Sequence, residues 1–239
     1  METLEKERGF RHQAARIGGA ALLLMAIAAS FSYGFVHESL TGNGDASATW
    51  NHLRSANLLL KSEIAGWILI LICDIVAAWA IYVFLKPVHE ALALLSAWFR
   101  LTYAAILGVS ILNLLFVSLL SGSPEKFAGL GQGQLPAVTM LFLDAFESIW
   151  SVGLIIFGGH LLIVGYVAIS SDHIPKIISI LLLLASAGYI LIHLAPMFLS
   201  ASDPIVVVME YIFKVPMIFG ELGFGLWLLF RGGKVTAKN

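Results

Sequence analysis

The stretch Ile64–Leu85 reads IAGWILILICDIVAAWAIYVFL, an apolar run that holds one charged residue, Asp74, near its centre. An α-helix rises about 1.5 Å per residue, so a run of this length crosses the ~30 Å hydrocarbon core of a bilayer. In lipid a helix satisfies its own backbone hydrogen bonds, and the alternating pattern of a barrel strand is absent here. We therefore predict a transmembrane helix from Leu60 to Leu85 with an ionisable group at mid-span.

The composition places the whole chain in the same class. Of its 239 residues, 59% are hydrophobic and 12% are charged, and the mean hydropathy is +0.90. Soluble domains carry about 25% charged residues, so this chain has too few polar side chains to cover a surface that faces water. The net charge of −1 argues against a nucleic-acid partner, which requires a basic face. The single cysteine, Cys73, excludes an internal disulfide and is interpreted as a small packing residue.

Further apolar runs along the chain are long enough to span a bilayer. The first contains Ile17–Val36, which reads as a signal anchor rather than a cleaved signal peptide. We predict an all-α integral membrane bundle, one domain over residues 1–239, with six transmembrane helices. They cover about Ala14–His37, Leu60–Leu85, Leu92–Leu120, a fourth segment that begins between Pro136 and Ile149 and ends near Ser170, Ile177–Leu199, and Ile205–Phe230. The sequence leaves open whether the fourth segment begins as a separate interfacial helix.

The distribution of Lys and Arg predicts the orientation, because cytoplasmic loops carry an excess of both. One side holds Lys6, Arg8, Arg11, Arg16, Lys86, Arg100, Lys176, Arg231, Lys234 and Lys238. The other side holds Arg54, Lys61 and Lys126. We therefore predict that both termini are cytoplasmic, with residues 1–13 as a short tail, and that loops 38–58 and 121–136 face outward. The predicted location is the inner or plasma membrane of the cell.

Several short motifs resemble one family in their order and spacing. They are Arg16–Gly18, Leu85–Val88, Phe99-Arg100, Phe157–His160, Gly165-Tyr166, His173–Lys176, Ala187–Tyr189, Gly220-Glu221 and Trp227–Leu229. Together they resemble a bacterial family of polytopic membrane proteins known as the domain of unknown function 4386, over nearly the whole chain. The resemblance implies a bacterial multi-pass membrane protein and assigns no activity.

Ionisable residues within the predicted spans are the candidates for function. Counted from the cytoplasmic helix ends, Asp74, His160 and Glu221 each lie roughly 15 Å into the membrane. A charge at the bilayer centre costs at least about 2.5–3.5 kcal/mol, so these groups must be paired, neutralised or exposed to a wet cavity. Arg100, by contrast, is interpreted as a residue that snorkels to the cytoplasmic surface.

Helical periodicity extends this set into polar stripes. Glu63 and Asp74 are eleven residues apart, which puts them on one helix face. Glu210, Lys214 and Glu221 follow at i, i+4 and i+11, and the first two can pair across one turn. We expect these stripes to face the bundle interior. The predicted cavity or proton relay consists of Asp74, His160, Glu221, Glu210, Lys214 and Glu63.

Two functions are compatible with these ionisable residues, and a third is a weaker hypothesis. The favoured one is transport or binding of a small solute, coupled to protons or cations, because carboxylates and imidazole exchange protons near neutral pH. So small a chain is expected to form a homo-oligomer in the lipid bilayer. The alternative is an intramembrane enzyme that uses zinc or another divalent metal, held by His37, His193 and Glu147, on a lipid-like substrate. A weaker third reading is haem bound between His160 and His193.

Overall fold

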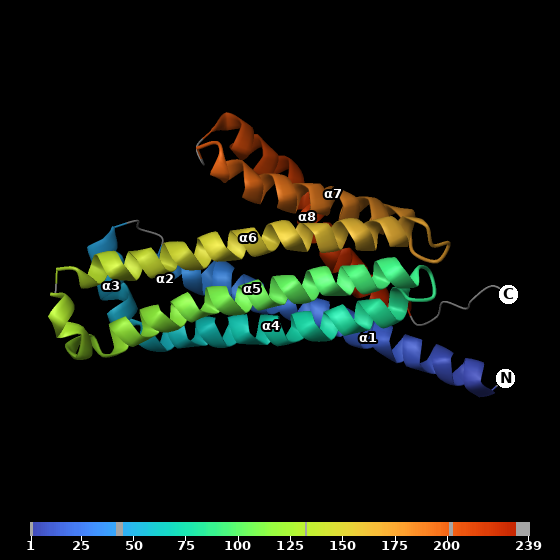
Figure 1. Cartoon of the computed structure of the whole chain (residues 1–239), viewed down its shortest axis with the longest axis horizontal. Coiled ribbons are helices and arrows are strands. Elements are labelled where there is room, and N and C mark those ends of the chain that lie inside the picture. The colour runs from blue at the N-terminus through green and yellow to red at the C-terminus, as the bar shows by residue number, and fades with distance from the viewer. Residues whose placement is uncertain (1, 42–44, 132, 201–202, 233–239) are drawn as a thin grey trace. The chain divides into compact units, whose positions relative to one another are not determined.

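Among the residues that it describes, the computed structural model contains only helices and connecting turns (Figure 1). It describes residues 2–41, 45–131, 133–200 and 203–232, so Lys234 and Lys238 of the predicted basic side lie outside the described residues. The elements in chain order are α1 (Glu2–Phe31), the π-helical turn η1 (Ser32–His37), α2 (Glu38–Thr41), α3 (Ala46–Ser55), α4 (Asn57–Leu85), α5 (Glu90–Gly122), the 3-10 helix η2 (Pro124–Leu130), α6 (Leu135–Ile169), α7 (Lys176–Leu194), the 3-10 helix η3 (Ala195–Met197) and α8 (Pro204–Phe230).

The described part of the chain holds five helical stretches that are long and apolar enough to cross a membrane. They are Glu5–Thr41, Asn57–Leu85, Glu90–Gly122, Leu135–Ile169 and Lys176–Met197. These stretches confirm a multi-pass membrane protein. The sixth predicted segment also folds as a helix, α8, whose charged residues interrupt its apolar run. Asp203 caps α8 by accepting a hydrogen bond from the Ile205 N–H at 2.9 Å, and Pro204 occupies the first helical position.

The helix boundaries differ from the predicted ones at both ends of the first span. The predicted tail is helical from Glu2 onward, so α1 extends well beyond the apolar run. At the other end, α1 continues through η1 and α2 to Thr41. The fourth segment begins at Leu135 and runs as one helix to Ile169, so α6 has no separate interfacial helix before it.

The two predicted outer loops contain helices of their own. In the first, the Asp45 side chain accepts a hydrogen bond from the Ala48 N–H at 2.9 Å and so starts α3. In the second, η2 precedes α6. Trp50 of α3 forms an apolar cluster with Leu120 and Leu135 from either side of η2. Burial of these large apolar side chains explains why segments with loop-like composition are ordered.

The chain divides into two compact units, each built from parts of several helices. Unit 1 comprises the described parts of Met1–Leu24, Cys73–Ala104 and Val152–Asn239. Unit 2 comprises the described parts of Met25–Ile72 and Ala105–Ser151. The prediction of a single domain stays a prediction.

Close helix packing in unit 1 depends on glycine. A Cβ on Gly19 of α1 would lie 2.5 Å from the backbone nitrogen of Leu229 in α8. A Cβ on Gly158 of α6 would lie 2.7 Å from the Ile190 side chain of α7. Helices α7 and α8 are also neighbours and lie side by side (Figure 1). Small residues at such contacts let helix backbones approach in the absence of a hydrophobic driving force. Gly223 of α8, by contrast, has no atom within 4 Å of the Cβ position.

Candidate functional site

An ion pair lies buried at the centre of unit 1. Arg100 of α5 holds Asp74 of α4 through a 2.8 Å contact between Nη2 and Oδ1, and each residue is only 1% exposed. The prediction that Arg100 snorkels to the membrane surface is therefore wrong. A guanidinium can stay inside protein because Asp74 supplies its counter-charge, and Asp74 in turn needs a cation.

His160 of α6 extends this pair into a chain of three side chains. Its Nδ1 lies 2.9 Å from the backbone oxygen of Ser96, and its Nε2 lies 3.1 Å from Arg100 Nη1. A carbonyl oxygen only accepts hydrogen bonds and a guanidinium only donates them. Both contacts are therefore satisfied when His160 is neutral with its proton on Nδ1. A second proton on Nε2 would remove the acceptor that Arg100 uses.

Glu221, the third predicted mid-span residue, has a different partner in the same unit. The Tyr189 hydroxyl of α7 donates to Glu221 Oε1 of α8 at 2.7 Å. The Phe157 ring lies between the two groups of contacts, because Tyr189 packs edge-on to it at 5.2 Å and the Arg100 guanidinium lies 5.2 Å from its centre. The three residues predicted to share a layer thus belong to one neighbourhood in unit 1, joined through Arg100, Phe157 and Tyr189.

One oxygen in this neighbourhood remains open. Asp74 Oδ2 is buried and accepts no hydrogen bond from the residues that the structure describes. Buried polar atoms are nearly always satisfied, so an open carboxylate oxygen beside an ion pair is a feature that calls for a function. Asp74 Oδ2 can therefore accept a proton without breaking the bond between Oδ1 and Arg100.

A second ionisable cluster lies in unit 2 and surrounds His37. Its Nδ1 lies 2.7 Å from Glu63 Oε1, and its Nε2 lies 3.3 Å from Glu147 Oε1. His37 and Glu63 are 3% and 1% exposed, whereas Glu147 is 52% exposed. Trp67 also donates its ring N–H to Glu63 Oε1, at 3.3 Å. The cluster thus leads from a buried carboxylate through an imidazole to a carboxylate that reaches the surface of this unit.

The backbone and the aromatic residues around His37 hold its ring in place. His37 is the last residue of η1, and π-helical turns inside helices occur frequently at functional sites. Tyr33, one turn earlier, stacks on the His37 ring at 5.4 Å with an interplanar angle of 16°. The Phe146 ring lies 5.5 Å from the His37 ring. This packing leaves the imidazole little freedom to rotate.

Two other predicted site residues are exposed. Glu210 and Lys214 lie on the uncovered face of α8, and no ion pair joins them in the described part of the chain. The prediction that this stripe faces the interior is wrong for Glu210 and Lys214, whereas Glu221 of the same stripe contacts Tyr189. The covered face of α8 is formed by small and apolar residues. That face consists of Val206, Pro216, Gly220, Phe224, Gly225 and Leu228.

The predicted metal site, made of His37, His193 and Glu147, stays a prediction, because its residues belong to two different units. Among the described residues, no three His, Cys, Asp or Glu side chains are arranged to hold a metal ion. His37 and Glu147 do meet in unit 2, but each ring nitrogen of His37 already faces a carboxylate oxygen. His193 belongs to unit 1, where its ring stacks on Tyr189 at 6.2 Å. For haem, both ring nitrogens of His160 are engaged by Ser96 and Arg100.

Comparison with known proteins identifies the family. The model of the domain of unknown function DUF4386 matches residues 17–232, which include both ionisable clusters. The chain belongs to this family. A relative from Archaeoglobus fulgidus, described as an uncharacterized protein, is 30% identical over 176 residues, which cover 73% of this chain and 86% of the relative. No solved structure matches the chain. The resemblance inferred from the motifs is confirmed, and the archaeal relative shows that similar sequences are not confined to bacteria.

DUF4386 membership and the geometry together define the chain as a multi-pass membrane protein with buried ionisable residues. Sequence reasoning missed two members of the unit 1 cluster, Arg100 and Tyr189. A signal for Arg100 was present. Asp74 lies eleven residues before the end of α4, and Arg100 lies ten residues after the start of α5. Two antiparallel helices joined by a tight turn bring such positions to the same depth.

Proposed function

We propose that this chain is a six-span protein of the cell membrane that binds or moves a small solute, coupled to protons or cations. In the proposed topology both termini are cytoplasmic and α8 is the sixth span. The observation that carries the functional proposal is the buried Arg100 shared between Asp74 and His160. Ionisable residues inside a membrane are costly, and they mark ion pathways and proton relays.

The chemistry follows from which groups can change charge. Arg100 contributes a guanidinium, whereas the carboxyl group of Asp74 and the imidazole of His160 can each gain or lose a proton. A proton on Asp74 removes the negative charge that neutralises Arg100. Arg100 then keeps its hydrogen bonds to Asp74 Oδ1 and His160 but loses the counter-charge of Asp74, and a carboxylate or phosphate of a solute would supply a negative charge that fits its planar pair of N–H donors. Proton binding and solute binding are thereby linked through one side chain.

The experiment is a flux assay in proteoliposomes loaded with a pH-sensitive dye. A potassium diffusion potential, or an imposed sodium gradient, drives protons or cations across the membrane. We expect flux above that of empty vesicles for the native protein, and its loss in Asp74→Asn. The matched control is Asp144→Asn, which removes the same charge from an exposed position of α6 and should leave the flux unchanged.

Two results would contradict the proposal. One is native protein that conducts no faster than empty vesicles under either gradient. The other is an Asp74→Asn variant, folded by circular dichroism, that conducts as fast as the native protein. A further variant, Glu221→Gln, tests whether the Tyr189 branch takes part. Loss of flux there as well extends the relay to α8, and retained flux limits it to Asp74, Arg100 and His160.

A further inference from the structure

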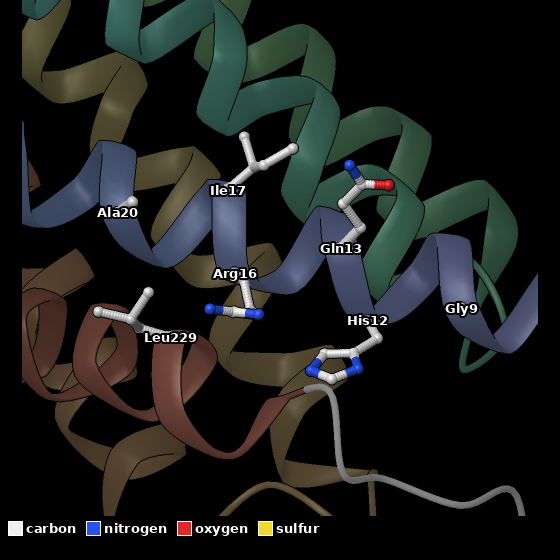
Figure 2. Close-up of a pocket in the computed structure, with 7 residues that line it drawn as sticks. All are labelled: Gly9, His12, Gln13, Arg16, Ile17, Ala20 and Leu229. Atoms are coloured by element: carbon white, nitrogen blue, oxygen red, sulfur yellow. The ribbon is translucent and has the colours of Figure 1, made fainter.

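An open surface groove with a volume of about 510 Å³, called the cavity below, lies in unit 1 against α1 and the end of α8. Its lining residues are Gly9, His12, Gln13, Arg16, Ile17, Ala20 and Leu229. Figure 2 shows Arg16 and His12 projecting from the same side of α1 toward the last turn of α8. Leu229 of α8 extends toward α1 in the same view. None of these residues takes part in the ionisable clusters described above.

The size of the cavity indicates the kind of molecule that it holds. A water molecule occupies about 30 Å³ in the liquid, and a single inorganic ion needs little more room. Pockets that bind organic ligands measure about 300–1,000 Å³. The cavity therefore fits a molecule with a polar group and several carbon atoms, rather than a lone ion.

The lining of the cavity has a cationic part and an apolar part. Arg16 supplies a permanent positive charge, and His12 and Gln13 supply hydrogen-bond donors one turn before it. None of the lining residues is acidic, and the described residues make no ion pair with Arg16. Ile17 and Ala20 of α1 and Leu229 of α8 supply the apolar part of the lining. A cationic end joined to an apolar end is complementary to an anionic amphiphile.

The position of the cavity along α1 supports the same conclusion. Before the cavity the helix carries basic residues at Lys6, Arg8 and Arg11, mixed with Glu5 and Glu7. After the cavity the helix is apolar. This change from charged to apolar sequence is where lipid headgroups meet acyl chains, and basic pockets between membrane helices bind anionic headgroups.

We propose that this cavity binds an anionic phospholipid. The phosphate contacts Arg16 and His12, and the first carbons of an acyl chain lie along Ile17, Ala20 and Leu229. The site is independent of the proposed transport function, since it shares no residue with it. Its ligand chemistry is that of a phosphate ester, and the size and the apolar part of the lining select the lipid over free phosphate.

The test is native mass spectrometry of the protein in mild detergent, titrated with phosphatidylglycerol or with phosphatidylcholine of the same acyl chains. We expect retention of phosphatidylglycerol over phosphatidylcholine. Arg16→Gln should weaken retention about fivefold, which corresponds to the ~1 kcal/mol of one cation near an anionic lipid surface. The matched control, Arg8→Gln, removes the same charge from the same helix outside the cavity and should change retention less than twofold.

A second variant tests the apolar part of the lining without changing any charge. Ala20→Phe places a ring in the cavity and should also reduce retention of phosphatidylglycerol. Equal retention of both lipids would overturn the proposal, and so would equal losses in Arg8→Gln and Arg16→Gln, which would indicate a diffuse surface charge. Displacement of the lipid by millimolar inorganic phosphate would instead assign the site to a soluble anion and overturn the lipid assignment.

Discussion

Substitution of one partner of the Asp74–Arg100 pair should lower the free energy of unfolding far more than substitution of both partners. Each residue is 1% exposed and the bond between them is 2.8 Å long, so either single substitution leaves a buried charge without its partner. We expect Asp74→Leu and Arg100→Met each to lower the free energy of unfolding by about 3–5 kcal/mol. The double variant has no buried charge to leave unpaired. It loses mainly the donor to His160 and should cost only about 1–3 kcal/mol, less than either single variant.

The assay is a double-mutant cycle measured by titrating micelle-folded protein with sodium dodecyl sulfate and following tryptophan fluorescence. The control is Glu90→Gln, which breaks the exposed Lys86–Glu90 pair of 3.1 Å in the turn between α4 and α5 and should produce no measurable loss. The ion pair contributes no coupling if the stability lost in the double variant equals the sum of the two single losses to within about 0.5 kcal/mol, because independent sites behave that way. That result would contradict the prediction. A coupling of about 3 kcal/mol or more supports it.

Three further predictions use the same titration. Gly19→Ala should cost about 1–3 kcal/mol of stability, because its Cβ would lie 2.5 Å from rigid backbone of α8. Gly223→Ala meets no atom within 4 Å and should be neutral or stabilising by up to about 1 kcal/mol, and equal effects of the two substitutions would contradict the packing. His160→Gln should have a free energy of unfolding about 1.5–3 kcal/mol higher than that of His160→Leu, because an amide can accept from Arg100 and donate to the Ser96 carbonyl as the imidazole does. Equal losses in the two variants would show that these hydrogen bonds contribute little. Tyr189→Phe should cost about 1.5–3 kcal/mol through the lost hydrogen bond to the partly buried carboxylate of Glu221, and no loss would remove this branch from the cluster.

The course of the helices through the membrane was largely predictable because it depends on length and apolarity. The run around Asp74 spans a bilayer whatever packs against it, and its predicted end at Leu85 is the end of α4. The predicted loops were less accurate. Trp50 is one apolar side chain in a polar segment, and its contact with Leu120 and Leu135 depends on residues distant in the chain.

Periodicity identified stripes but could not tell which stripe is covered. Glu63 and Asp74 were predicted on one face, and both are buried. The same argument placed Glu210 on a face with Glu221, yet Glu210 is exposed. A period relates residues within one helix, whereas the covered face is chosen by what the neighbouring helices can pack against. On α8 that face contains Gly220 and Gly225, which allow close approach.

Charge and hydropathy are properties of the residues alone, and from them it follows that this chain crosses the membrane several times and that Asp74 and His160 need partners. Which partners they have depends on the packing of the helices. The guanidinium of Arg100 lies between them because three helices meet at one depth with their side chains turned inward. The π-helical turn that ends at His37 departs from the 100° per residue of a regular α-helix, so periodicity alone does not give the direction of that ring. Partner choice depends on helix rotation and register, which the packing of the whole chain decides.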